Sequence, residues 1–199
     1  MSKTTIAVFF GGCSPEYSVS LQSAAAVLEA LPEEKYEAVP VGITREGRWY
    51  RFWGDPQAIR EDRWLRQGQC VPAILSPDRA DRGLFLFDDG GVRRIPIDAA
   101  LPVMHGSFGE DGTIQGLIAL SGIPLVGCGV LASALGMDKA RSHQLAAQAG
   151  IETARWVVLE ENAPPIKALA FAQEMGWPVF VKPAGAGSSF GVSRVEREE

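Results

Sequence analysis

The sequence has few of the residues that build disulfide frameworks and metal sites. Its 199 residues include two histidines and three cysteines, Cys13, Cys70 and Cys128, which are far apart and show no CxxC spacing. This usage predicts reduced, buried thiols rather than disulfides or zinc ligands. With so few candidate ligands, we expect no metal site formed by this chain itself.

Runs of positive charge and long hydrophobic segments are also missing. The formal net charge is -5 and no stretch is rich in Lys or Arg, which argues against nucleic acid or an anionic membrane as a partner. The apolar stretch near the start is too short for a signal peptide or a membrane span. With 46% hydrophobic and 22% charged residues, the composition is typical of a globular protein, which we expect to be cytoplasmic.

The first 130 residues alternate between apolar segments of strand length and segments with helical periodicity. Helices are expected over residues 19–31 and 111–122, and residues 54–80 are expected to form a loop with one short helix. Strands are expected over residues 4–10, 36–43, 48–52, 99–105 and 123–128, with an Asp-Gly hairpin over residues 83–97. This order predicts an α/β fold with a doubly wound parallel sheet, in which ligands collect at the carboxyl ends of the strands.

A second, smaller α+β unit is expected after residue 130. The pattern predicts helices over residues 131–150 and 164–176, a strand over 154–159, and two strands joined by a glycine-serine loop within 177–195. We therefore predict two domains, residues 1–130 and residues 131–199.

A carboxylate stands in a turn that would otherwise suit a phosphate. The stretch FFGGCSPEYSVSL (Phe9 to Leu21) predicts a strand end, a two-glycine turn and a helix, with Ser14 as the N-cap and Glu16 in the first turn. A helix N-terminus attracts anions, and Glu16 would compete with a phosphate for the same N–H groups. Two interpretations follow: Glu16 interacts with the helix dipole, or it binds a cation such as the ammonium group of an amino-acid-like ligand.

A second loop of similar placement holds His105, Glu110 and Asp111, in the stretch MHGSFGEDGTIQG (Met104 to Gly116). Asp111 could simply cap the following helix, and His105 could simply hydrogen bond within the loop. Because both loops follow strands of one parallel sheet, we also predict that His105 lies near Glu16.

The third candidate is the stretch FVKPAGAGSSFGV (Phe180 to Val192). Lys182, backbone N–H groups and the hydroxyls of Ser188 and Ser189 could face phosphate oxygens, although a generic flexible hairpin has the same pattern. Lys139 lies on a predicted helix, where a solvated lysine is the ordinary case. The sequence has neither a Walker A loop nor a GxGxxG fingerprint, which disfavours a nucleotide-binding oxidoreductase.

Five ordered motifs together resemble the D-alanine–D-alanine ligases. They are FFGGCSPEYSVSLQSA, MHGSFGEDGTIQG, GIPLVGC, MDKARS and VFVKPAGAGSSFGV. The segments FGGCS, VGITREGRWY and GSSFGV are more similar to the vancomycin-resistance branch, whose members make D-alanine–D-lactate or D-alanine–D-serine. The resemblance implies a Rossmann-like preATP-grasp substrate domain over residues 1–130 and the start of an ATP-grasp domain over residues 131–199. It also implies that ATP phosphorylates one D-alanine carboxylate before a second D-amino or D-hydroxy acid attacks.

The resemblance assigns roles to individual residues of the first domain. It implies that Glu16 binds the ammonium group of the first D-alanine, that Val19 makes an apolar contact with this substrate, and that His105 lies near its carboxylate. Ser107 stands where relatives commonly have a basic residue.

In the second domain the resemblance implies an ATP site. Lys139 and Lys182 match lysines that contact ATP phosphates, and Ser188 and Ser189 match serines of a loop that closes over the γ-phosphate, with Ser188 also bonding toward Glu16. Residues 184–186 are Ala, Gly and Ala, where relatives usually have an arginine.

The resemblance also implies Mg²⁺ and a homodimer, but the Mg²⁺ ligands of the family follow the point where this sequence ends. We therefore expect the 199-residue chain alone to be inactive in ligation. The alternative is a non-catalytic binding or regulatory module of the same fold.

Overall fold

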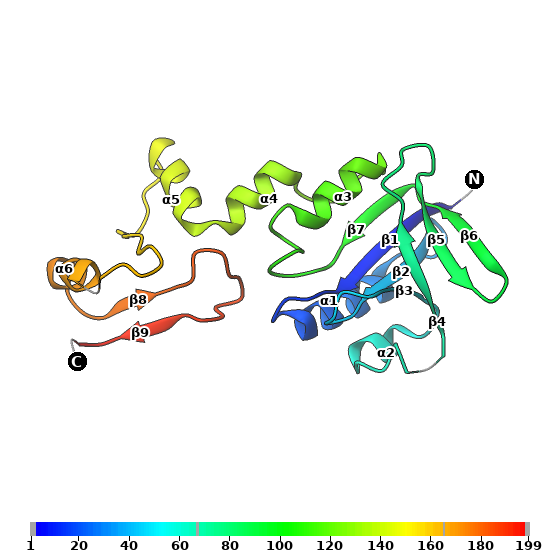
Figure 1. Ribbon diagram of the computed structural model, residues 1–199, viewed down its shortest axis with the longest axis horizontal. Coiled ribbons are helices and arrows are strands. Elements are labelled where there is room, and N and C mark those ends of the chain that lie inside the picture. The colour runs from blue at the N-terminus through cyan, green and yellow to red at the C-terminus, as the bar shows by residue number, and fades with distance from the viewer. Residues whose placement is uncertain (1–2, 67, 165, 198–199) are drawn as a thin grey trace. The chain divides into compact units, whose positions relative to one another are not determined.

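The computed structural model describes residues 3–66, 68–164 and 166–197, and it divides into two compact units (Figure 1). Unit 1 is Met1–Ala134 and unit 2 is Leu135–Glu199. The division falls inside helix α4 (Val130–Met137).

Unit 1 is built on a seven-stranded sheet with the order β6-β5-β4-β3-β2-β1-β7. The strands are β1 (Thr4–Gly11), β2 (Tyr36–Ile43), β3 (Trp49–Phe52), β4 (Cys70–Leu75), β5 (Gly83–Asp88), β6 (Gly91–Pro96) and β7 (Ala99–Pro102). Strand β1 pairs in parallel with β2 and with β7, whereas the pairs from β2 to β6 are antiparallel. The predicted α/β class is confirmed, and the parallel part is the group β2-β1-β7.

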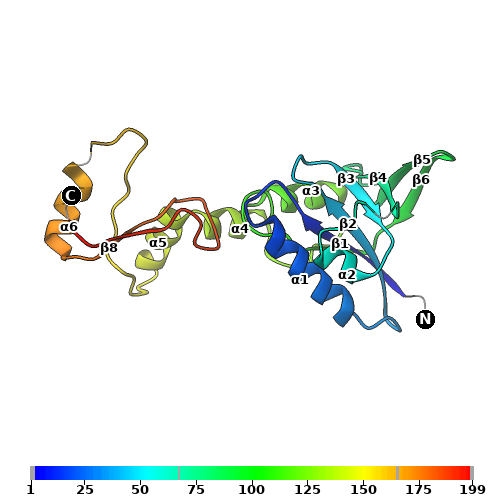
Figure 2. The ribbon, with the colours of Figure 1, turned by 90° about the horizontal axis from the view of Figure 1, so that it is seen from below.

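Helices cover both faces of this sheet (Figures 1 and 2). Helices α1 (Tyr17–Ala30) and α2 (Pro56–Arg60) lie on one face, and α3 (Thr113–Ser121) lies on the other. Successive side chains of a strand point to opposite faces, so neighbouring residues of β1 enter different cores. Phe9 belongs to the core under α3 with Ile114 and Ile118, and Phe10 belongs to the core under α1 with Trp64. Both cores hold β1 rigidly in place, and β1 leads directly to Glu16.

Two predictions for unit 1 are wrong in detail. Residues 70–75, expected to belong to a loop, form β4, whose buried Ala73 and Leu75 alternate with exposed Pro72 and Ile74. This alternation is short and contains a proline, so the sequence alone does not predict a strand. The strand forms because it pairs with β3 and β5. Residues 123–128, expected to form a strand, make one isolated parallel bridge, between Ala100 and Leu125. The Asp-Gly hairpin is confirmed as β5 and β6.

Unit 2 contains α5 (Lys139–Gln148), α6 (Ile166–Met175) and a two-stranded antiparallel sheet of β8 (Val179–Val181) and β9 (Ser193–Val195). The single helix expected over residues 131–150 is divided at Asp138, whose extended backbone ends α4 and whose carboxylate caps α5. The strand expected over residues 154–159 is not formed. Among the described residues of this unit, Ala172 is the one buried hydrophobic side chain.

The three cysteines are free thiols, but the prediction that they are buried is wrong for two of them. Cys13 and Cys128 are exposed because they lie in loops, whereas Cys70 is half-buried at the start of β4. Within the described ranges, no helix is long and apolar enough to cross a membrane.

Candidate functional site

The turn between β1 and α1 buries Glu16 almost completely. The residue is 2% exposed, and α1 begins one residue later, at Tyr17, rather than directly after Ser14 as the predicted N-cap implied. Ser14 still satisfies an N–H group of this turn, because its hydroxyl accepts a hydrogen bond from the Glu16 backbone N–H at 3.1 Å. The helix starts later because Ser14 to Tyr17 form a separate tight turn, closed by a bond from the Tyr17 N–H to the Ser14 carbonyl.

The carboxylate of Glu16 lies against Gly106 of the loop that follows β7. A Cβ atom on residue 106 would be 2.3 Å from Glu16 Oε2 and 2.8 Å from Oε1. Gly106 also has a φ of +68°, a region that residues with a side chain rarely adopt. Hence the two strand-end loops meet, and the predicted approach of the Glu16 turn to the His105 loop is confirmed.

Three serines join these two loops. Ser14 Oγ donates to the backbone carbonyl of His105 at 2.7 Å. Ser20 is fully buried, accepts a bond from the Gly11 N–H and donates to the Val103 carbonyl. Ser23 Oγ lies 3.0 Å from His105 Nε2. The β1–α1 turn, the helix α1 and the β7–α3 loop are therefore one hydrogen-bonded assembly.

Sequence reasoning missed the roles of these serines, although a signal was present. Glu16, Ser20 and Ser23 are spaced four and three residues apart, so they lie on one face at the start of α1. A polar stripe on a helix that is otherwise rich in Ala and Leu indicates contacts with other polar groups. Val19, on the same helical turn, is 43% exposed and free to contact a ligand.

The two acidic residues after His105 hold their own loop in shape. Glu110 Oε2 accepts from the Gly106 N–H at 2.7 Å, and Asp111 accepts from the N–H groups of Phe108 and Thr113. Burial opposes ionisation of Asp111, but these N–H groups and the Thr113 hydroxyl outweigh it, so the pKa of Asp111 lies below its ordinary value. The N-cap position of α3 is Gly112, and Asp111, one residue earlier, accepts from the first N–H of the helix, that of Thr113.

His105 bonds outside its own loop, because its ring contacts Ser23 of α1. Among the described residues, no group donates a hydrogen bond to the Glu16 carboxylate. The arrangement therefore leaves a buried carboxylate, an imidazole nitrogen and an exposed Val19 at one edge of the sheet. An ammonium group with a neighbouring carboxylate and a small apolar side chain matches this set.

In unit 2, Lys139 contacts the glycine-serine loop. Its Nζ donates to the carbonyls of Ala184 and Ala186, and its backbone N–H donates to the Ala184 carbonyl at 3.0 Å. The ordinary interpretation, a solvated lysine, is therefore wrong. Lys139 stabilises the loop that was expected to hold phosphate.

The loop itself has a strained backbone at both serines. Ser188 and Ser189 have φ values of +48° and +60°, a conformation that costs a residue with a side chain about 1 to 2 kcal/mol each. Lys182, at the start of the loop, lies 5.9 Å from the centre of the Phe180 ring. The glycine-serine loop thus forms a defined turn that carries Lys182 and the two serine hydroxyls, and Lys139 of α5 contacts this turn through the Ala184 and Ala186 carbonyls.

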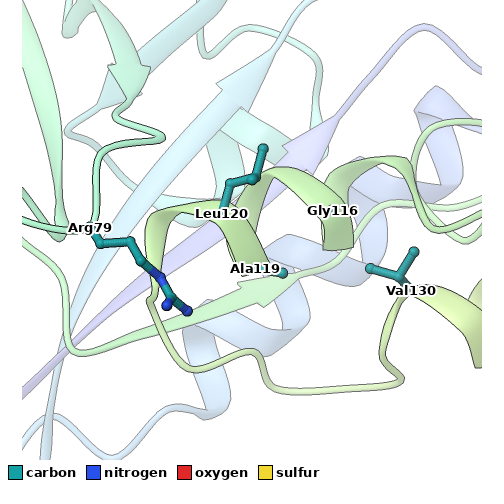
Figure 3. Close-up of a pocket in the computed structure, with 5 residues that line it drawn as sticks. All are labelled: Arg79, Gly116, Ala119, Leu120 and Val130. Atoms are coloured by element: carbon teal, nitrogen blue, oxygen red, sulfur yellow. The ribbon is translucent and has the colours of Figure 1, made fainter.

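A separate open groove of about 610 Å³ lies on unit 1. Figure 3 shows its lining, which consists of Arg79, Gly116, Ala119, Leu120 and Val130. Gly116, which ends the stretch MHGSFGEDGTIQG, lines it, but none of the candidate site residues does. Within the described part of the chain, no group of three or more His, Cys, Asp or Glu side chains could hold a metal ion.

Two family profiles match most of the chain. The profile described as D-ala D-ala ligase N-terminus matches residues 5–128, and the profile described as D-ala D-ala ligase C-terminus matches residues 145–199.

Individual relatives agree with these profiles. The chain is 42% identical to a D-alanine–D-alanine ligase of Caldicellulosiruptor bescii and 48% identical to one of Corynebacterium efficiens, over 100% of the chain and 55% of each relative. Among solved structures, the VanG D-Ala:D-Ser ligase of Enterococcus faecalis is similar, with a TM-score of 0.86 and 41% identity over 99% of this chain and 57% of that one. The chain therefore spans about 55% of the length of the curated relatives.

Proposed function

Because the chain belongs to the D-alanine–D-alanine ligase family, we propose that it is the amino-terminal part of an ATP-dependent ligase that joins D-alanine to D-alanine, D-serine or D-lactate. The observation that carries this proposal is the buried Glu16 carboxylate against Gly106, in the loop that also presents His105. A buried anion is costly unless a cation or hydrogen-bond donors compensate it. The ammonium group of an amino acid supplies that compensation.

The first substrate site belongs to unit 1. Glu16 pairs with the ammonium group of D-alanine, Val19 contacts its methyl group, and His105 donates a hydrogen bond to its carboxylate. The serine bonds that join the two loops support this assignment, because they fix the distance between the group that binds the ammonium and the group that binds the carboxylate.

Unit 2 supplies the groups that bind ATP. Lys139 and Lys182 offset the phosphate charge, and Ser188 and Ser189 cover the γ-phosphate, with Ser188 acting in catalysis. When bound, ATP supplies the phosphoryl group that turns the D-alanine carboxylate into an acyl phosphate. The amine or hydroxyl of the second substrate then attacks the acyl carbon, and phosphate leaves. The loop must also exclude water, which would hydrolyse the acyl phosphate.

The wider assignments rest on the family. The product is a dipeptide or depsipeptide precursor of peptidoglycan, the protein works in the cytoplasm as a homodimer, and Mg²⁺ accompanies ATP. We assign Mg²⁺ no step, because the sequence offers no matched ligand for it.

Binding of D-alanine to the 199-residue chain tests the proposal directly. We expect Glu16→Gln, which keeps the shape of the side chain and removes its charge, to weaken D-alanine binding at least about tenfold, or about 1.4 kcal/mol. The matched control is Glu34→Gln, at an exposed glutamate remote from the turn. D-lactate, an anion without an ammonium group, serves as the probe whose binding Glu16→Gln does not weaken. Equal binding of D-alanine by wild type and Glu16→Gln would overturn the proposal.

A phosphate-release assay addresses the alternative, a non-catalytic module. Relatives 42% and 48% identical are named as ligases, which disfavours that alternative. We nevertheless expect the 199-residue chain alone to bind D-alanine without releasing phosphate from Mg-ATP, since none of its residues was matched to the family's Mg²⁺ ligands. D-alanine-dependent ADP formation at about 1 per second by the mass-verified chain would contradict this expectation.

A further inference from the structure

We propose that Ser23 is a positioning residue that selects the tautomer of His105, with the proton on Nδ1 and with Nε2 accepting a bond from the Ser23 hydroxyl. The benefit of this tautomer rests on the proposed function, because a protonated Nδ1 can donate a hydrogen bond to a substrate carboxylate. It concerns a residue to which neither the family profiles nor the motifs assign a role.

The contacts of the imidazole ring separate its two nitrogens. Nε2 lies 3.0 Å from Ser23 Oγ, on the side of the ring that faces α1. Nδ1 has no hydrogen-bond partner among the described residues, and it is not among the buried polar atoms that lack one. Nδ1 is therefore the ring nitrogen available to a ligand.

The direction of the Ser23–His105 bond follows from the needs of the hydroxyl. A serine hydroxyl has one proton to donate, and in a helix its usual alternative acceptor is the carbonyl four residues earlier. The structure shows no such bond for Ser23, and His105 Nε2 is the acceptor within its reach, so we infer that the Ser23 hydroxyl donates to Nε2. An imidazole that accepts at Nε2 and is neutral must carry its proton at Nδ1.

The backbone around the ring keeps this arrangement in place. The His105 carbonyl accepts from Ser14, and the next residue, Gly106, is packed against the Glu16 carboxylate. Ser23 thus prevents a neutral His105 from presenting a lone pair to the substrate carboxylate, which would be repulsive. Without Ser23, the neutral ring could place its proton on either nitrogen, and only part of the population would be able to bind.

Nitrogen NMR of the imidazole rings tests this without any ligand. The chain has only two histidines, so His143→Gln assigns the His105 signals by subtraction. At about pH 8.5, where an ordinary imidazole is neutral, we expect Nδ1 of His105 to resonate as a protonated nitrogen and Nε2 as an acceptor. We expect Ser23→Ala to move both signals toward averaged values, and Ser23→Thr, which keeps the hydroxyl, to restore them. The backbone amide spectrum of each variant verifies that it is folded.

The outcomes separate this inference from the proposed function. A protonated Nε2 in the wild type, or an unchanged tautomer in Ser23→Ala, would overturn the inference. D-alanine is then added to each variant. If it shifts the Nδ1 signal of His105 in wild type and in Ser23→Thr, and shifts it less in Ser23→Ala, the role of Ser23 in D-alanine binding is supported. A correct tautomer with no effect of D-alanine would leave the inference standing and would count against the proposed function.

Discussion

At the scale of single residues, the close contact between Gly106 and Glu16 makes residue 106 decisive for the site. We expect Gly106→Ala to lower D-alanine affinity at least about tenfold, because a Cβ would meet Glu16 Oε2 at 2.3 Å and the φ of +68° adds strain. Calorimetric or NMR titration of D-alanine measures this. Gly116→Ala is the matched control, since a Cβ there meets nothing within 4 Å. An unchanged affinity in Gly106→Ala would mean that the loop moves freely and that Glu16 is not fixed by it.

Tyr17, the first residue of α1, makes the free energy of unfolding depend on pH in the alkaline range. Burial is the main cause that raises the pKa of Tyr17 to about 12, with Asp62 adding to the rise and the bond from Trp64 opposing it. A raised tyrosine pKa means that the folded state favours the protonated form. Its contribution is therefore complete below about pH 10 and is lost as the pH rises toward 12.

We expect the free energy of unfolding to fall by up to about 2 kcal/mol more over this range in wild type than in Tyr17→Phe. Urea titrations at several pH values give the two curves. Tyr36→Phe, at another tyrosine of unit 1, is expected to keep the wild-type dependence. Parallel curves for wild type and Tyr17→Phe would contradict the assignment.

At the scale of elements, the N-terminus of α5 depends on its cap. Asp138 accepts a hydrogen bond from the Arg141 N–H at 3.0 Å, immediately before Lys139, which contacts the glycine-serine loop. We expect Asp138→Ala to destabilise α5 by about 1 kcal/mol and to speed amide exchange over residues 141–148. Asp138→Ser, which can also cap, is expected to retain most of the protection. Exchange unchanged in Asp138→Ala would show that packing, not the cap, sets the start of this helix.

At the scale of the whole molecule, the two units differ in their cores. Unit 1 encloses two apolar clusters, whereas in the described part of unit 2 Ala172 is the single buried hydrophobic residue and Ile166 and Phe180 are 68% and 58% exposed. Hydrophobic burial is the main source of stability, so unit 2 is expected to open first.

Limited proteolysis checks this expectation. We expect early cleavage C-terminal to Ala134 and a persistent fragment that contains β1 to α3, and added D-alanine should protect that fragment further. Mass spectrometry of the fragments identifies the cleavage sites. Early cleavage within β1 or α1 would contradict the order of stability.

Much of the local structure was predictable from the sequence, because it depends on neighbours in the chain. The apolar run of β1, the helical period of α1, the Asp-Gly hairpin of β5 and β6, and the Gly122 stop of α3 are all determined by local patterns. The family motifs also singled out Glu16, His105, Lys139 and Lys182 as candidate site residues. The strand β4 was missed because its alternation is short and contains Pro72. The break at Asp138 was missed although an aspartate is a favoured N-cap residue, because the helical period continues on both sides of it.

The tertiary structure alone decided how these residues meet. Ser23 and His105 are separated by 82 positions, Ser14 and His105 by 91, and Lys139 and Ala186 by 47. Such contacts are set by the parallel pairing of β1 with β7 and by the contact of the β8–β9 loop with the start of α5, not by any period in the sequence. The sequence alone determined which chemical groups are present, and folding determined which atoms face each other, because distances between distant residues follow from strand pairing and core packing.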